Sequence, residues 1–314
     1  MLNSFLDAVA KTRRALPLCA LVLASLPASQ ALAAHGAGVS PGWKQCRSAN
    51  PDERIAGCTQ VIGDISKEST HNQLAAYVNR AGAYQAKGDY AHAIEDYGKA
   101  LEVEPTSAVV LLARGAAQHA KGDIDAAIAD YGAAIEKDKK SVAAFMARAS
   151  AWRVKGDADK MLADLEAAVK LDKKTGGPLA ARGTHFHGKG EHDRAIADYS
   201  DALKREPRLV GALVGRGGCY YSKAEYDKAI VDFDAVLKID PKNALALVNR
   251  ANAWRGKKDF ERASKDYEAA LVIKPDLASA KKGLDDVTRI IAKKAASGAA
   301  SGDAPPASVE HEHH

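Results

Sequence analysis

The sequence repeats itself every 34 residues, and this period limits the possible folds more than any other feature of the chain. Six copies follow one another without insertion or deletion and end at residue 277; they begin at Leu74, Ala108, Val142, Gly176, Val210 and Ala244. Each copy holds two segments with apolar residues at helical spacing. We therefore predict a solenoid of six helix-turn-helix units, in which each unit buries its apolar face against its neighbours.

Residues that recur at one place in the repeat indicate how the two helices of a unit pack. Large residues in the second helix form a column that we expect to be core: Tyr97, Tyr131, Leu165, Tyr199, Phe233 and Tyr267. A glycine between the helices can end the first helix in the left-handed conformation: Gly88, Gly122, Gly156 and Gly190. The aspartate that follows can cap the second helix: Asp89, Asp123 and Asp157. Ala224 and Lys258 replace the glycine in the last two copies, which costs about 1 kcal/mol each if the backbone is kept.

The motif in the first copy combines several of these positions. It reads Asn79-Arg80-Ala81-Gly82-Ala83-Tyr84, then Lys87-Gly88-Asp89-Tyr90, Ala93-Ile94-Glu95-Asp96-Tyr97 and Pro105. These residues resemble the tetratricopeptide repeat family, and the resemblance covers residues 74–294. It implies an all-α fold, a right-handed superhelical solenoid with capping helices at both ends. It also implies a protein-interaction scaffold whose first helices face a concave groove.

The two ends of the chain differ from the repeats. Residues 1–33 contain a basic stretch, a short apolar run and an Ala-x-Ala cleavage pattern, which together predict a signal peptide. Residues 34–73 are a linker and a degenerate half repeat, in which 54–62 matches a second helix and 43–47 supplies its partner. Residues 278–294 continue as a polar capping helix. Residues 295–314 are dominated by Ala, Gly, Ser and Pro, and we expect them to be disordered.

The signal peptide predicts an exported protein. Its basic start and Ala-x-Ala end suit a bacterial envelope, so we expect a periplasmic location, with secretion as the alternative. Cys46 and Cys58 lie twelve residues apart, and in an oxidising compartment they would close a disulfide worth about 2–4 kcal/mol. Cys219 is expected to be a small buried hydrophobe, with an intermolecular bridge as the alternative.

Charged residues recur in two columns, one in each helix of every copy. The arginine column is Arg80, Arg114, Arg148, Arg182, Arg216 and Arg250. The aspartate column is Asp96, Asp130, Asp164, Asp198, Asp232 and Asp266. Because a buried guanidinium normally pairs with a carboxylate, we interpret the two columns as a structural ladder of ion pairs. The alternative hypothesis is that the arginines bind acidic ligands.

A third column, the variable column, has a residue type that differs from copy to copy. It lies on the first helices, between two columns of small residues, and consists of Gln85, His119, Arg153, His187, Tyr221 and Arg255. Small neighbours let a ligand backbone approach closely, and long polar side chains can then hold it. We predict that this column contacts a partner protein or peptide. The alternative is that these are ordinary solvated side chains.

Several classes of function have no support in the sequence. Hydrolase, metalloprotease and phosphate-loop motifs are absent, so we predict no catalytic activity and no cofactor. The net charge of +5 is spread over interspersed basic and acidic residues, which argues against nucleic-acid binding. No apolar run is long enough for membrane insertion. We predict no metal site, because His185 and His187 point to different faces of one helix.

The sequence therefore predicts an exported, non-catalytic scaffold that docks a segment of a partner protein in its groove. Two rival hypotheses remain. One is a structural module that self-associates through its terminal helices. The other is a metal-buffering protein that uses the His-rich segment 310–314, although biased composition alone explains that segment.

Overall fold

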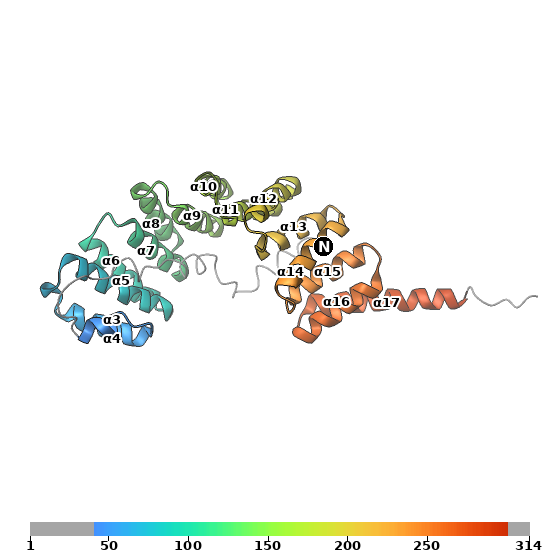
Figure 1. The fold of residues 1–314 in the computed structure, drawn as a ribbon, viewed down its shortest axis with the longest axis horizontal. Coiled ribbons are helices and arrows are strands. Elements are labelled where there is room, and N and C mark those ends of the chain that lie inside the picture. The colour runs from blue at the N-terminus through green and yellow to red at the C-terminus, as the bar shows by residue number, and fades with distance from the viewer. Residues whose placement is uncertain (1–40, 301–314) are drawn as a thin grey trace, which may run out of the picture. The chain divides into compact units, whose positions relative to one another are not determined.

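The structure is a computed structural model that describes residues 41–300 (Figure 1). Among these residues it contains fifteen α-helices, one 3-10 turn and no strand. The prediction of an all-α solenoid is thus confirmed. The predicted signal peptide and residues 301–314 of the tail lie outside the described residues.

Each repeat contributes two antiparallel helices, as the periodicity predicts. The first helices are α5 (Thr70–Ala86), α7 (Ala108–Lys121), α9 (Val142–Lys155), α11 (Gly177–Gly188), α13 (Val210–Ser222) and α15 (Ala244–Gly256). The second helices are α6 (Tyr90–Val103), α8 (Ile124–Lys137), α10 (Ala158–Leu171), α12 (His192–Arg205), α14 (Tyr226–Ile239) and α16 (Phe260–Ile273). All six second helices have 14 residues and start 34 residues apart, so the sequence register is kept in three dimensions.

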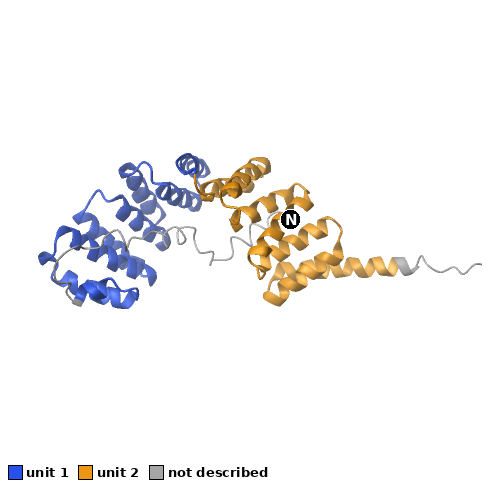
Figure 2. Cartoon of the chain, viewed as in Figure 1, with its two compact units in different colours: residues 1–173 blue, residues 174–314 orange. Residues whose placement is uncertain are grey.

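The chain divides into two compact units, residues 1–173 and 174–314 (Figure 2). The described part of the first unit holds the N-terminal cap and repeats one to three. The second unit holds repeats four to six and α17 (Ala278–Ala300). Within each unit every helix packs against the next one along the chain.

The predicted core columns are buried in both units. The exposed fractions of Tyr131 and Tyr267 are 0%, and Leu165 is 4% exposed. Small residues opposite them make room for the rings: a Cβ placed on Gly115 would lie 2.7 Å from the ring of Tyr131. Burial of a side chain of this size contributes about 1.5–3 kcal/mol to stability, so each of these residues stabilises its repeat.

The turns confirm the expected backbone. Gly88, Gly122, Gly156 and Gly190 have φ values between +77° and +101°. Ala224 and Lys258 keep the same left-handed turn, with φ of +59° and +65°, although they carry a Cβ.

The predicted aspartate caps are correct at two of three positions. Asp89 accepts a hydrogen bond from the backbone N–H of His92 at 3.2 Å, and Asp157 accepts one from that of Lys160 at 3.1 Å. Asp123 makes no such bond, and its carboxylate instead accepts from Lys121 Nζ at 2.8 Å. Lys121 precedes the turn and holds the carboxylate of Asp123 from that side, whereas Asp157 pairs with Lys160 inside the helix that it caps.

The N-terminal cap consists of α3 (Pro41–Cys46), α4 (Pro51–Gly63) and the 3-10 turn η1 (Ile65–Lys67). A disulfide between Cys46 and Cys58 joins α3 to α4, and both cysteines are fully buried. The first helix of repeat one, α5, starts at Thr70, four residues before the predicted repeat boundary at Leu74, because Ser69 accepts a hydrogen bond from the N–H of Asn72 at 3.3 Å and caps the helix there.

The C-terminal helix α17 is longer than predicted. It continues to Ala300, six residues beyond the expected end at 294. The added segment is rich in alanine, the residue with the highest helix propensity. Its alanines extend the helix, although the Ala, Gly, Ser and Pro content of the whole tail suggests disorder. Val287 and Ala280 of α17 pack on the last repeat. Within residues 41–300, no helix combines the length and apolarity needed to cross a membrane.

Candidate interaction surface

The arginine and aspartate columns meet inside every repeat. Each arginine donates from Nε and Nη2 to the two carboxylate oxygens of the aspartate sixteen residues later, at 2.7–2.9 Å. The aspartate side chains are 3–11% exposed and the arginines 18–27%. These bidentate pairs tie the first helix of each repeat to the second.

In several repeats the remaining guanidinium nitrogen reaches the helix before. Arg216 Nη1 donates to Ser200 Oγ at 3.1 Å, and Arg250 Nη1 to Asp234 Oδ1 at 2.5 Å. Arg80 Nη1 donates to Thr59 Oγ1 in α4 at 3.0 Å. Donation of hydrogen bonds to the paired aspartates raises the pKa of these arginines above its ordinary value. Their hydrogen-bonding groups are therefore used within the fold, as the structural interpretation expects.

In the first unit, the variable column lies on α5, α7 and α9. Gln85 accepts a hydrogen bond from the hydroxyl of Tyr97 at 3.2 Å. His119 is half-buried, and burial lowers its pKa, with the charge of Arg153 lowering it further. Arg153 itself is exposed. The three side chains thus offer an amide, a neutral imidazole and a guanidinium on successive first helices.

In the second unit, the column lies on α11, α13 and α15. Tyr221 is 37% exposed, and its ring centroid lies 5.7 Å from that of Tyr226. Arg255 Nη1 lies 3.7 Å from Asp286 Oδ2 in α17, so the capping helix neutralises part of its charge. His187 is half-buried, and its Nδ1 lies 3.0 Å from Cys219 Sγ. These three side chains contact other residues of the protein, whereas the sequence analysis expects them to be available to a partner.

Two of the small residues beside the variable column, Thr184 and Asn252, are polar and accept hydrogen bonds from core tyrosines. Tyr199 donates its hydroxyl hydrogen to Thr184 at 3.0 Å, and Tyr267 donates to Asn252 at 2.6 Å. Desolvation raises the pKa of Tyr199 and of Tyr267 to about 12, so both remain neutral donors. The tyrosines of the core therefore fix the polar side chains of the first-helix face.

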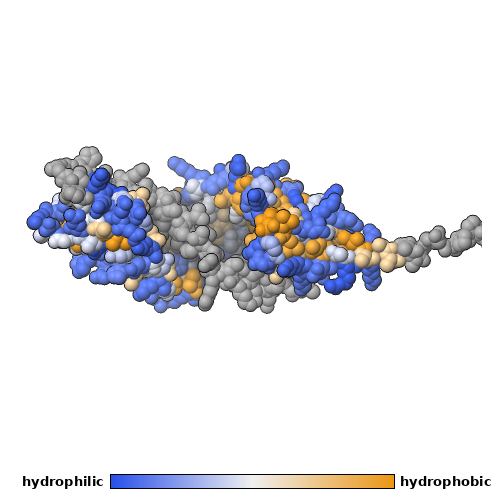
Figure 3. All heavy atoms as spheres, turned by 90° about the horizontal axis from the view of Figure 1, so that it is seen from below, coloured by the Kyte–Doolittle hydropathy of each residue, from blue (hydrophilic) through white to orange (hydrophobic). Residues whose placement is uncertain are grey.

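Apolar side chains are also exposed on the second unit. Figure 3 shows apolar surface gathered among polar side chains in the part of the view that belongs to this unit. Val231 is 66% exposed, Leu245 64% and Val272 84%. Single exposed hydrophobes are ordinary on protein surfaces.

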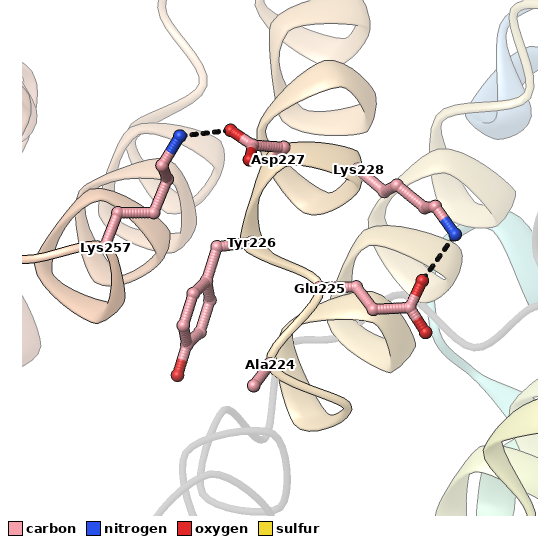
Figure 4. A pocket seen from close by; sticks show the side chains of 6 residues that line it. All are labelled: Ala224, Glu225, Tyr226, Asp227, Lys228 and Lys257. Carbon is pink, nitrogen blue, oxygen red and sulfur yellow. Dashed lines mark hydrogen bonds and ion pairs between the residues drawn. The ribbon is translucent and has the colours of Figure 1, made fainter.

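A hollow of about 400 Å³ lies at the turn between α13 and α14 (Figure 4). Tyr226 projects beside Lys257, and the acidic and basic groups of the lining pair with each other. Lys257 pairs with Asp227, and Lys228 donates to Glu225 at 2.5 Å. Paired, exposed charges of this kind do not form the convergent set of polar groups that a small-molecule site needs.

The structure also brings together three residues that the sequence analysis did not combine. His187, His192 and Cys219 each offer a nitrogen or sulfur atom within 4.8 Å of the other two. Cys219 is fully buried, as predicted, and it is the free cysteine of the described residues. The signal that could have found this group is the coincidence of two departures from the repeat pattern, at His192 and Cys219, with a histidine of the variable column within 33 residues.

The geometry of the repeats agrees with comparisons to known proteins. Family models of the tetratricopeptide repeat match residues 74–107 and residues 112–178, 180–244 and 225–278. The chain belongs to the tetratricopeptide repeat family. Proteins of this family are in general non-catalytic scaffolds for protein–protein interaction. No curated protein matches the sequence.

Solved structures of tetratricopeptide repeat proteins share the fold. PilF of Pseudomonas aeruginosa is 15% identical with a TM-score of 0.60, covering 70% of this chain and 100% of its own. The C-terminal part of a repeat protein from Cytophaga hutchinsonii is 17% identical, with a TM-score of 0.59. The match covers 75% of this chain and 95% of that protein's chain. YrrB, described as having an unusual peptide-binding site, is 22% identical, with a TM-score of 0.51. The match covers 60% of this chain and 97% of the YrrB chain.

Proposed function

We propose that this protein is an exported scaffold that binds a segment of a partner protein on its first-helix face, through the variable column. The observation that carries the proposal is the contrast between positions in one helix. The arginine column is identical in all six repeats and is bound within the fold, whereas the variable column changes residue type from repeat to repeat. A side chain that the repeat architecture required would recur with the repeat.

The chemistry of the column suits an extended polar segment. Arg153 and Arg255 provide cations, His119 and Gln85 provide neutral donors or acceptors, and Tyr221 provides an exposed ring. Aromatic and arginine side chains carry much of the binding energy at protein interfaces. The peptide-binding site described for YrrB supports the same general use of the fold.

Export is part of the proposal. The disulfide between Cys46 and Cys58 supports it, because such bonds persist in oxidising compartments and are rare in the cytosol of most organisms. Cell fractionation and N-terminal sequencing should find the chain in the periplasm, beginning at Ala34. An unprocessed cytosolic chain would contradict this part of the proposal while leaving partner binding open.

Self-association through the terminal helices is the second candidate. Val272 and Ile290, in α16 and α17, are 84% and 40% exposed near the C-terminal end of the solenoid. Burial of such side chains between copies would stabilise a dimer. Under this alternative the molecular mass measured by light scattering rises with protein concentration.

A pair of photo-crosslinking residues tests docking on the first-helix face. A crosslinking phenylalanine analogue replaces Tyr221 on the first-helix face in one chain, and Val231 on the second helix α14 in a matched control. Both positions are exposed, so neither change disturbs the core. Partner adducts at position 221 that are absent at 231 support the proposal. No partner adduct at position 221, or the same adducts at both positions, would contradict docking on the first-helix face.

A further inference from the structure

We propose that His187, His192 and Cys219 form a site for one zinc ion that links the fourth repeat to the fifth. This inference goes beyond partner binding and does not depend on it. His187 lies at the end of α11, and His192 begins α12 of the same repeat. Cys219 lies in α13, the first helix of the next repeat. Among residues 41–300, this is the one group of three histidine, cysteine or acidic side chains whose candidate ligand atoms come within 4.8 Å of one another.

The contacts within the group place three donor atoms around one point. His187 Nδ1 lies 3.0 Å from Cys219 Sγ, and the ring centroids of His187 and His192 are 5.3 Å apart. His192 Nδ1 is buried and has no hydrogen-bond partner. A buried ring nitrogen without a partner carries a desolvation cost that a metal bond would remove. Both histidines are half-buried, so an ion can reach the site from solvent.

The neighbouring repeats provide internal controls. At the places equivalent to Cys219, four of the other five repeats have alanine: Ala83, Ala117, Ala151 and Ala253. At the places equivalent to His192 the residues are apolar or aromatic: Tyr90, Ile124, Ala158, Tyr226 and Phe260. One repeat further on, Tyr221, Tyr226 and Ala253 hold these places, and the two tyrosine rings have a similar spacing of 5.7 Å. The fold therefore needs neither the imidazole of His192 nor the thiol of Cys219, yet both occur at the same junction.

The donor set fits zinc. Zinc binds imidazole nitrogen and thiolate sulfur in tetrahedral geometry, with Zn–N near 2.0–2.1 Å and Zn–S near 2.3 Å. Ligand atoms of such a site lie about 3.4–3.6 Å apart. The candidate atoms now lie within 4.8 Å of one another, so side-chain rotations that move them by about 1 Å would bring them to this spacing. Three protein ligands leave a fourth position for water or for a group of a partner.

Binding would change the state of the cysteine. Without metal, burial raises the pKa of the Cys219 thiol to about 12, so the sulfur is protonated. When the Zn–S bond forms, the S–H proton leaves to solvent and the thiolate is held by the ion. Zinc does not change oxidation state, so no electron acceptor is required.

The test uses the metal-free chain with its Cys46–Cys58 disulfide intact and without an affinity tag, and His311, His313 and His314 are changed to Ala so that the tail does not bind metal. Zinc is measured per chain after gel filtration, and Co²⁺ is used as a spectroscopic probe. We expect one zinc ion per chain. We also expect near-ultraviolet charge-transfer absorption from a Co–thiolate bond, and visible bands of four-coordinate cobalt that zinc abolishes.

Three variants adopt residues that other repeats carry at the same places, so each is expected to fold: Cys219→Ala, His192→Tyr and His187→Gln. Each should weaken zinc binding by more than about 100-fold. Cys219→Ala should also remove the charge-transfer band, which loss of a packing residue would not explain. Circular dichroism verifies that the helical content is unchanged. Absence of stoichiometric zinc, or a cobalt spectrum that survives Cys219→Ala, would overturn the proposal.

Discussion

The arginine ladder and the variable column lie five residues apart on the same helices, but the structure uses them differently. The ladder has one residue type in six repeats, and each arginine is held by two hydrogen bonds to a buried aspartate. The variable column has four residue types in six repeats, and its members contact different neighbours, including Tyr97, Cys219 and Asp286. A packing requirement that recurs with the period selects the same residue each time. A side chain that varies serves something that is not periodic, such as a partner or an ion.

The largest expected effect is the loss of one ladder pair. Arg148→Met leaves the carboxylate of Asp164, which is 5% exposed, without its partner. We expect the free energy of unfolding to fall by about 3–5 kcal/mol, measured by urea denaturation. The matched double variant, Arg148→Met with Asp164→Leu, removes both charges and should recover most of the loss. If Arg148→Met instead leaves stability nearly unchanged but abolishes partner binding, the ladder is a ligand site.

The N-terminal cap joins its helices with a disulfide where the repeats use an ion pair. Changing Cys46 and Cys58 to Ala should lower stability by about 2–4 kcal/mol, because the bond closes a loop of twelve residues. Adding a reductant to the unchanged chain should have the same effect on thermal unfolding. An equal melting temperature with and without reductant would show that the packing of Trp43 and Val61 is sufficient to hold the cap.

The turns offer a smaller test, because two repeats depart from the glycine column without a visible gain. Ala224→Gly and Lys258→Gly should each raise stability by about 1 kcal/mol, since both residues have positive φ. Gly156→Ala is the matched opposite change and should lower stability by a similar amount. Chemical denaturation measures all three. No gain from either glycine variant would mean that other contacts of these side chains offset the backbone strain.

The smallest expected effect concerns pH and the variable column. Because burial lowers the pKa of His119 in the folded chain, the unfolded chain binds a proton at higher pH than the folded one. This contribution to stability is complete above the unfolded pKa of about 6.5 and is lost as pH falls toward the folded value. His119→Gln, the residue found at position 85, should flatten the dependence of stability on pH below 6.5. An unchanged profile would place the histidine in a solvated environment.

Most of the fold could be predicted from the sequence because it is set by residues that recur. Gly88 and its equivalents mark the turns, and the column of large residues from Tyr97 to Tyr267 marks the core. The ends were less predictable, since they lack the period. The cap of α5 at Ser69 and the extension of α17 to Ala300 depend on local hydrogen bonding and alanine propensity.

The candidate sites were predictable only in part, and the reason is distance along the chain. Spacing within one helix separates His185 from His187 and argues against a metal site. It does not show that His192, beyond the turn, and Cys219, in the next repeat, come to the same place. Likewise, the sequence places Gln85 and Arg255 on the first-helix face but does not show their bonds to Tyr97 and Asp286. Contacts between side chains of different helices require the packed structure.

The central claim is that the variable column, and not the ladder, selects the partner. The decisive measurement is crosslinking of the chain in its native cell, with identification of the captured proteins by mass spectrometry. It compares the unchanged chain with one in which Gln85, His119, Arg153, Tyr221 and Arg255 are changed to Ala, while His187 is kept so that zinc binding stays intact. We predict that the variant keeps the helical content of the unchanged chain, measured by circular dichroism, and loses its partner proteins. The same partners on both chains would contradict the claim.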